Sequence, residues 1–435
     1  MNPAQTANAF FGALCVILLA CLGMSRLARR VGQPSIVAQM ATGVLLGPSV
    51  LGLLWPHSQP LLFPAAVRPL LYAVGQFGLI VFMFRAGREF KTNRPKGAVR
   101  SAAFVSSIGS AAPLVLGTVA ALWLGHWAGV FQTGTPVLVT AAFVGVTLTV
   151  TAFPMVASIV QSRGYSRVRF GPLALACGAI DDVVAWLLLA AVTAAAAGSS
   201  RIALIALVGG LAFAAVTWGA GRRFFTWRLR RSGDDGRRLV WVIVAVLGAA
   251  CFTDEIGLYT VFGAFCVGMV LPETPAADRV VEEITPLAQR IFLPVFFVYS
   301  GLNTRFSLIA SPQVLIFTGA CVAAAIIGKL GGCWAAARLS GESNATSTRL
   351  GTLMNARGLM QLIALNVGLQ DHIVGGALFA SLVVVAFVTT VMAAPLLVLA
   401  DQRWPIKAPV AISPETPLTA PYPKGVPNLA QAEPG

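Results

Sequence analysis

The chain has 435 residues, of which 57% are hydrophobic and only 11% are charged, and its formal net charge is +15. A soluble protein would carry about 25% charged residues, so this composition excludes a large soluble domain and indicates a polytopic membrane protein. An excess of basic residues in such a protein is typical of cytoplasmic loops, and it does not indicate a nucleic-acid partner.

Apolar segments of about 20 residues, the length that crosses a bilayer, predict an all-α fold of about 13 transmembrane helices. The predicted spans are 8–27, 33–54, 67–87, 99–124, 135–160, 171–196, 202–221, 238–253, 256–271, 287–302, 313–337, 347–369 and 373–400. The segment from Pro272 to Pro286 is expected to be a loop. Residues 1–400 then form one transmembrane domain, and the proline-rich residues 401–435 are expected to be a disordered cytoplasmic tail.

The basic residues test this order of spans because they concentrate on the cytoplasmic side. They cluster after the first, third, fifth and seventh predicted spans, at Arg26, Arg29, Arg30, Arg85, Arg88, Lys91, Arg94, Lys96, Arg100, Arg163, Arg167, Arg169, Arg222, Arg223, Arg228, Arg230, Arg231, Arg237 and Arg238. We therefore expect a multi-pass protein of the plasma (inner) membrane, with its N-terminus outside and its C-terminus in the cytoplasm.

An odd number of spans is consistent with two inverted six-helix repeats that flank the seventh span. The fifth and twelfth predicted spans contain polar stretches that are candidates for interrupted helices crossing at the midplane. The residues at these two candidate breaks are Thr149, Thr151, Pro154, Asn355, Gly358 and Gln361. The alternative for the fifth span is a continuous helix that Pro154 only kinks and whose threonines bond to their own backbone.

Asp181 and Asp182 are adjacent in the sixth predicted span, where one buried charge costs about 2.5–3.5 kcal/mol on insertion scales. Two intramembrane bases, Lys329 and Arg357, could pair with them. A buried lysine can lose its proton whereas arginine stays charged, so Lys329 is the switchable partner of Asp181 and Arg357 a fixed counter-charge. Asp182 is then free to hold either a proton or a monovalent metal cation, and competition between the two is antiport. The alternative is a permanent ion pair that only holds helices together.

Five stretches carry a family resemblance: GQPSIVAQMATGVLLGPSVLG, IDDVVAW, FLPVFFVYSGL, IIGKLGGCWAAARLSG and TLMNARGLMQLIALNVGL. With them the chain resembles monovalent cation:proton antiporters of the branch that includes Kef-type transporters and plant cation/H+ exchangers. The resemblance implies a core domain that moves like an elevator against a dimerisation domain, and therefore a homodimer in the membrane lipid.

The same resemblance assigns roles to single residues. It implies that Asp182 is the essential carboxylate for cation and proton, that Lys329 is the intramembrane lysine, and that Thr151 and Arg357 belong to the crossing helices. An aspartate at position 181 implies more than one proton per cation. Gln361 departs from the family pattern, since many relatives carry glutamate there, and it leaves the choice between Na+ and K+ open.

Two further departures concern the ends of helices. Arg85 and Arg88 interrupt the motif that precedes Glu89, which is usually apolar in the family. No nucleotide-binding domain follows the last predicted span, so gating by such a domain, as in Kef-type transporters, is not expected.

Two other functions remain open at this point. One is a Na+-coupled symporter of an organic anion on the same fold, with Arg357 as the anion contact, and the other is a sensor or scaffold without turnover. The chain shows no spacing typical of a nucleophile–base pair or a cofactor site, so we expect no enzyme, no catalytic residue and no cofactor.

Overall fold

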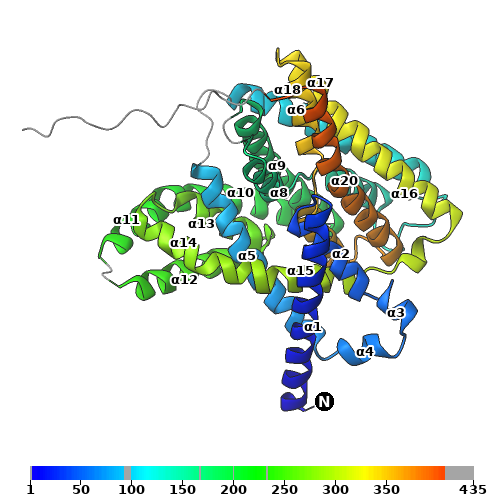
Figure 1. Ribbon diagram of the computed structural model, residues 1–435, viewed down its shortest axis with the longest axis horizontal. Coiled ribbons are helices and arrows are strands. Elements are labelled where there is room, and N and C mark those ends of the chain that lie inside the picture. The colour runs from blue at the N-terminus through cyan, green and yellow to red at the C-terminus, as the bar shows by residue number, and fades with distance from the viewer. Residues whose placement is uncertain (1, 93–98, 166–167, 199, 232–233, 407–435) are drawn as a thin grey trace, which may run out of the picture.

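The computed structural model describes residues 2–92, 99–165, 168–198, 200–231 and 234–406. Within these ranges every regular element is a helix and no strand occurs. The helices assemble into two bundles joined by a long connecting helix (Figure 1).

The first bundle takes its helices from two separate parts of the chain. It consists of α1 (Pro3–Arg30), α2 (Ser35–Leu46), α3 (Leu51–Leu54), α4 (Ser58–Leu62), α5 (Arg68–Thr92), α12 (Asp235–Glu255), α13 (Tyr259–Val270), α14 (Pro275–Leu287) and α15 (Leu293–Leu302). Its centre is the contact of α5 with α13, where a Cβ atom on Gly268 would lie 2.0 Å from the Phe84 carbonyl oxygen. Only glycine permits this approach of two backbones, as is common between membrane helices.

The second bundle is formed by the remaining parts of the two halves. It consists of α6 (Val99–Leu124), α7 (Val137–Thr149), α8 (Phe153–Ser162), α9 (Phe170–Ala196), α16 (Pro312–Ala325), α17 (Gly332–Leu339), α18 (Asn344–Met354), α19 (Leu359–Gln370) and α20 (Gly376–Arg403). Each half contributes a long helix, a broken helix and another long helix in the same order, the pattern expected of a repeat. Between the bundles run α10 (Ser200–Val216) and α11 (Arg222–Arg231).

Within the described ranges, eight helices are long and apolar enough to cross a bilayer, so the chain is a multi-pass membrane protein. The other predicted spans correspond to shorter or interrupted helices: α7 with α8, α10 with the π-helical turn Thr217–Gly221, α13, the π-helical turn Ala288–Phe292 with α15, and α18 with α19. The total of about 13 spans therefore stays a prediction.

The expectation of a loop from Pro272 to Pro286 was wrong, because α14 occupies most of this segment. Thr274 caps the helix by accepting a hydrogen bond from the Ala277 amide at 3.3 Å, and Pro275 takes the first helical position. Proline is favoured there because its missing N–H would have no partner in the first turn.

Near the C-terminus, α20 continues to Arg403, three residues past the predicted domain boundary. Asp401 accepts a hydrogen bond from Arg349 Nε at 2.8 Å, which ties this end of α20 to α18. The predicted disordered tail lies otherwise outside the described residues, from position 407 onward.

Candidate functional site

Two interrupted helices meet in the second bundle. The regular helix is interrupted between the end of α7 at Thr149 and the start of α8 at Phe153, and again between Met354 of α18 and Leu359 of α19. The Ala152 amide donates to the Ala356 carbonyl at 3.2 Å, so the two breaks lie side by side. Four helix ends with unpaired backbone groups therefore converge on one buried place.

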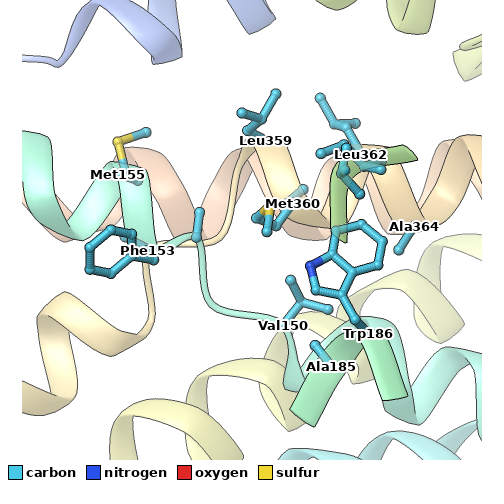
Figure 2. Packing of buried hydrophobic residues seen from close by; sticks show 14 of the residues in the cluster. Val150, Phe153, Met155, Ala185, Trp186, Leu359, Met360, Leu362 and Ala364 are labelled. Carbon is cyan, nitrogen blue, oxygen red and sulfur yellow. The ribbon is translucent and has the colours of Figure 1, made fainter. Parts of the chain in front are cut away.

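The second break depends on Gly358, whose backbone has φ 53° and ψ −111°. Residues with a Cβ atom rarely adopt this conformation, and holding one there costs about 1–3 kcal/mol. Figure 2 shows the start of α19 after this break, with Met360 beside Val150 of the first break and Trp186 of α9.

Asp181 is fully buried on α9 and surrounded by donors. Its Oδ2 atom lies 2.6 Å from Lys329 Nζ and 2.9 Å from the Thr151 hydroxyl. Its Oδ1 atom accepts from Ser110 at 3.1 Å and from Ser106. A buried carboxylate with an ion-pair partner and three hydroxyl donors has its negative charge compensated.

Lys329 is fully buried in a π-helical turn, Ile326–Gly331, between α16 and α17. Single π turns of this kind occur frequently at functional sites. Besides Asp181, its ammonium group donates to the Thr149 carbonyl at 2.8 Å. Thr149 is the last residue of α7, and the negative end of a helix dipole favours a cation.

Asp182, the next residue on α9, has a different environment. It is 2% exposed, and neither carboxyl oxygen has a hydrogen-bond partner within the described part of the chain. The amide of Phe153, at the positive end of α8, lies beside it. The adjacent void has a volume of only about 10 Å³ and is lined by Val150, Trp186 and Met360, among others. Two adjacent carboxyl groups therefore differ in their hydrogen bonding: Asp181 is surrounded by donors, whereas Asp182 has none among the described residues.

Arg357 lies in the second break and is fully buried. Its Nη2 atom donates to the Ala325 carbonyl at 3.0 Å, whereas Nε and Nη1 have no partner among the described residues. In the same part of the chain it forms no ion pair with either aspartate within 4 Å. The neighbouring side-chain amide of Asn355 is likewise buried without a partner.

The other predicted residues of the breaks lie at their edges. The Thr149 hydroxyl bonds back to the Gly145 carbonyl at 3.0 Å within α7, and Pro154 is the second residue of α8. Gln361 is buried on α19, and its Nε2 donates to the Leu382 carbonyl of α20 at 3.3 Å. The amide of Gln361 is thus directed towards α20, and no hydrogen bond links it to the aspartate pair.

Sequence reasoning missed Ser106 and Ser110 of α6. The available signal was their spacing of four residues, which places both hydroxyls on one face of an apolar helix. Serine is common in membrane helices, so this signal by itself did not distinguish a donor pair from packing residues.

Two larger cavities lie between the bundles. One of about 730 Å³ is lined by Tyr72, Asp254, Tyr259 and Asp371, and also by Thr193 of α9. Burial raises the pKa of Asp371, and its hydrogen bond from Tyr259 at 3.3 Å opposes that shift. This cavity begins beyond the small void at Asp182, one helical turn further along α9 and α19.

The second cavity, of about 450 Å³, is lined by Gln39, Arg85, Glu89 and Ser158, among others. Arg85 and Glu89 form an ion pair of 2.7 Å. Arg88 donates to the Leu271 carbonyl at 2.9 Å and so fastens α5 to the end of α13, whereas Arg85 lines the cavity.

Comparison with known proteins gives close matches over almost the whole chain. The chain is 32% identical to the Na(+)/H(+) antiporter NhaS4 of Synechocystis over 88% of its own length and 95% of that protein. It is 31% identical to the cation/H(+) antiporter 18 of Arabidopsis thaliana, over 88% of its length but only 48% of that longer protein.

Solved structures agree with the fold. The sodium proton antiporter MjNhaP1 from Methanocaldococcus jannaschii superposes with a TM-score of 0.67 over 93% of this chain and 98% of that one, at 14% identity. Residues 16–399 match the family model described as "Sodium/hydrogen exchanger, transmembrane". The chain therefore belongs to the sodium/hydrogen exchanger family, a family of monovalent cation:proton antiporters.

Proposed function

We propose that the protein is a secondary active antiporter that exchanges a monovalent cation, Na+ or K+, for protons at Asp182. The observation that carries this proposal is the contrast within the aspartate pair. Asp181 has four donors, including Lys329, whereas Asp182 has no hydrogen-bond partner among the residues that the structure describes. The names of the relatives, antiporters of Na+ and of other cations for H+, support the same reaction.

The exchange follows from charge compensation. An ionised carboxylate without donors is costly to bury, so Asp182 must be neutralised by a proton or by a cation. Both ligands use the same two oxygens, and binding of one therefore displaces the other. The ion pair of Asp181 with Lys329 has no net charge and leaves the competition to a single group.

Alternating access is proposed to arise from movement of the second bundle against the first, as in an elevator. Cavities on both flanks of Asp182 and the closed void between them support this proposal. Few polar contacts cross between the bundles near the site, among them Asn366 to Ser300 at 2.8 Å and Tyr259 to Asp371 at 3.3 Å. Such contacts can be exchanged without breaking a helix.

We further propose a homodimer in the plasma membrane, with the N-terminus outside and the C-terminus in the cytoplasm. The alternation of basic loops supports this orientation. The first bundle is the proposed dimer-forming part, because α1 leaves Leu19 and Leu22 exposed on its surface.

The test uses purified protein in liposomes with an interior pH dye and an imposed proton gradient. Addition of Na+, K+ or Li+ should collapse the gradient for the wild-type protein and identify the ion. Asp182→Asn should abolish the response while the protein still inserts. Asp234→Asn, the same change at an exposed carboxylate, serves as the matched control. Exchange that persists in Asp182→Asn would remove the central claim.

An organic-anion symporter remains the second candidate because Arg357 has two buried nitrogen atoms, Nε and Nη1, without a partner among the described residues. Against it stands the size of the void at Asp182, about 10 Å³, which is far below the volume of an organic solute. Solute uptake driven by Na+, together with no response to a proton gradient, would favour this candidate. No transport in either assay would favour the scaffold.

A further inference from the structure

The helix α11 concentrates positive charge at the end of the connection between the bundles. Its sequence, RRFFTWRLRR, contains five arginines and no acidic residue. Neither the proposed exchange nor the packing of the bundles uses these arginines.

The position of α11 follows from the length of the connecting helix. The chain is helical without a break from Ser200 through a π-helical turn, Thr217–Gly221, to Arg231. At 1.5 Å per residue this helix is about 48 Å long. The hydrocarbon core of a bilayer is about 30 Å thick, so the last ten residues extend to the level of the lipid headgroups.

The two faces of α11 differ in chemistry. Phe225 and Leu229 are buried against the protein, at 3% and 5% exposure. Arg223, Trp227 and Arg231 follow one another at intervals of four residues and form an exposed stripe. Tryptophan and arginine together at this depth are typical of a helix face that contacts the membrane interface.

The guanidinium groups on this face are held by aromatic rings. The Arg228 guanidinium lies 4.2 Å from the ring centre of Trp241 on α12 and 5.2 Å from that of Trp227. The guanidinium of Arg231 lies 5.0 Å from the Trp227 ring. A guanidinium packed on a ring keeps its N–H edge available, and that edge matches the oxygens of a phosphate group.

The charge of this face is not compensated by the protein. In the described part of the chain, no ion pair involves Arg222, Arg223, Arg228 or Arg231. Neighbouring arginines, in contrast, are paired: Arg237 with Asp234 at 3.9 Å, and Arg279 with Asp235 at 2.9 Å. Among the described residues, the charge of these four arginines of α11 is thus left without an acidic partner.

We propose that α11 and Trp241 form a binding site for the phosphate of an anionic phospholipid in the cytoplasmic leaflet. Arg223, Arg228 and Arg231 supply the charge and the N–H edges, and Trp227 and Trp241 hold the guanidinium groups at headgroup level. Because α11 ends the connection between the two bundles, a lipid held there contacts the segment that must accommodate their relative movement.

The experiment measures lipid binding to delipidated protein in detergent by native mass spectrometry, and it does not depend on transport. The probes are phosphatidylglycerol, phosphatidylcholine and inorganic phosphate. The wild-type protein should retain phosphatidylglycerol in preference to the other two. The variant Arg223→Gln/Arg228→Gln/Arg231→Gln should bind it about 100-fold more weakly.

A lysine variant distinguishes a specific phosphate-binding site from general electrostatic attraction to anionic lipid. Arg223→Lys/Arg228→Lys/Arg231→Lys keeps the charge that orients the helix but loses the planar fork, and it should bind about tenfold more weakly. The matched control Arg237→Gln/Arg279→Gln changes two paired arginines and should bind as the wild type does. Undiminished binding by the lysine variant, equal retention of phosphatidylcholine, or equal competition by inorganic phosphate would overturn the proposal.

Discussion

Removal of Lys329 should destabilise the protein strongly, and the loss should depend on Asp181. Both side chains are fully buried and their charged atoms lie 2.6 Å apart. Replacing one partner of a buried ion pair costs about 3–5 kcal/mol, because the other charge remains without compensation. The three hydroxyl donors to Asp181 reduce this cost, so we expect Lys329→Met to lose about 3 kcal/mol.

The double variant Asp181→Asn/Lys329→Met removes both charges. We expect it to recover most of the lost stability, since replacing both partners of a buried pair is often nearly neutral. Lowering the pH should also stabilise the single variant, because protonation of Asp181 removes the uncompensated charge. The assay is thermal unfolding of purified protein in detergent at several pH values. A single variant as stable as the wild type, or a double variant less stable than the single one, would refute this account of the pair.

Three other predictions concern access and the helix breaks. Trp186→Ala should speed the modification of Asp182 by a water-soluble carbodiimide, because Trp186 lines the void beside it, whereas Trp186→Phe should leave the rate unchanged. Gly358→Ala should lower the free energy of unfolding by about 1–3 kcal/mol, because alanine rarely adopts the backbone conformation of Gly358. A thermal unfolding midpoint equal to that of the wild type would contradict this prediction. Asp254→Asn/Asp371→Asn should raise the apparent KM for the cation by a factor on the order of 3 at low salt, and an unchanged KM would show that this cavity does not attract cations.

The fold was largely predictable because a bilayer imposes simple rules. The lengths of the apolar segments predicted most of the helices, and the two polar stretches lie where α7 and α18 end. The exceptions have physical causes. The segment from Pro272 to Pro286 was expected to be a loop, yet Pro275 begins a helix and Pro286 lies near the end of that same helix. Proline at these positions does not distinguish a loop from a helix unless the hydrogen bond that caps the helix is known.

The site was predictable in composition and less so in geometry. The insertion cost of charge identified Asp181, Asp182 and Lys329 without any structure. The register of Lys329 could not be predicted, because a π-helical turn adds a residue to the helix and rotates the side chains that follow. Nor did the sequence show which aspartate receives the serine hydroxyls, since that depends on how α6 packs against α9.

The distribution of donors also bears on stoichiometry. With the pair of Asp181 and Lys329 closed, Asp182 is the one member of the aspartate pair without an ion-pair partner among the described residues, and one proton would exchange for one monovalent cation without net charge movement. Transport of a second proton, as an aspartate at position 181 implies, requires Lys329 to release its own. The wild-type exchange rate should then respond to an imposed membrane potential, whereas Asp181→Asn/Lys329→Met should exchange at a rate that is independent of potential. If the variant still responds to potential, the second proton is carried by a group other than Lys329.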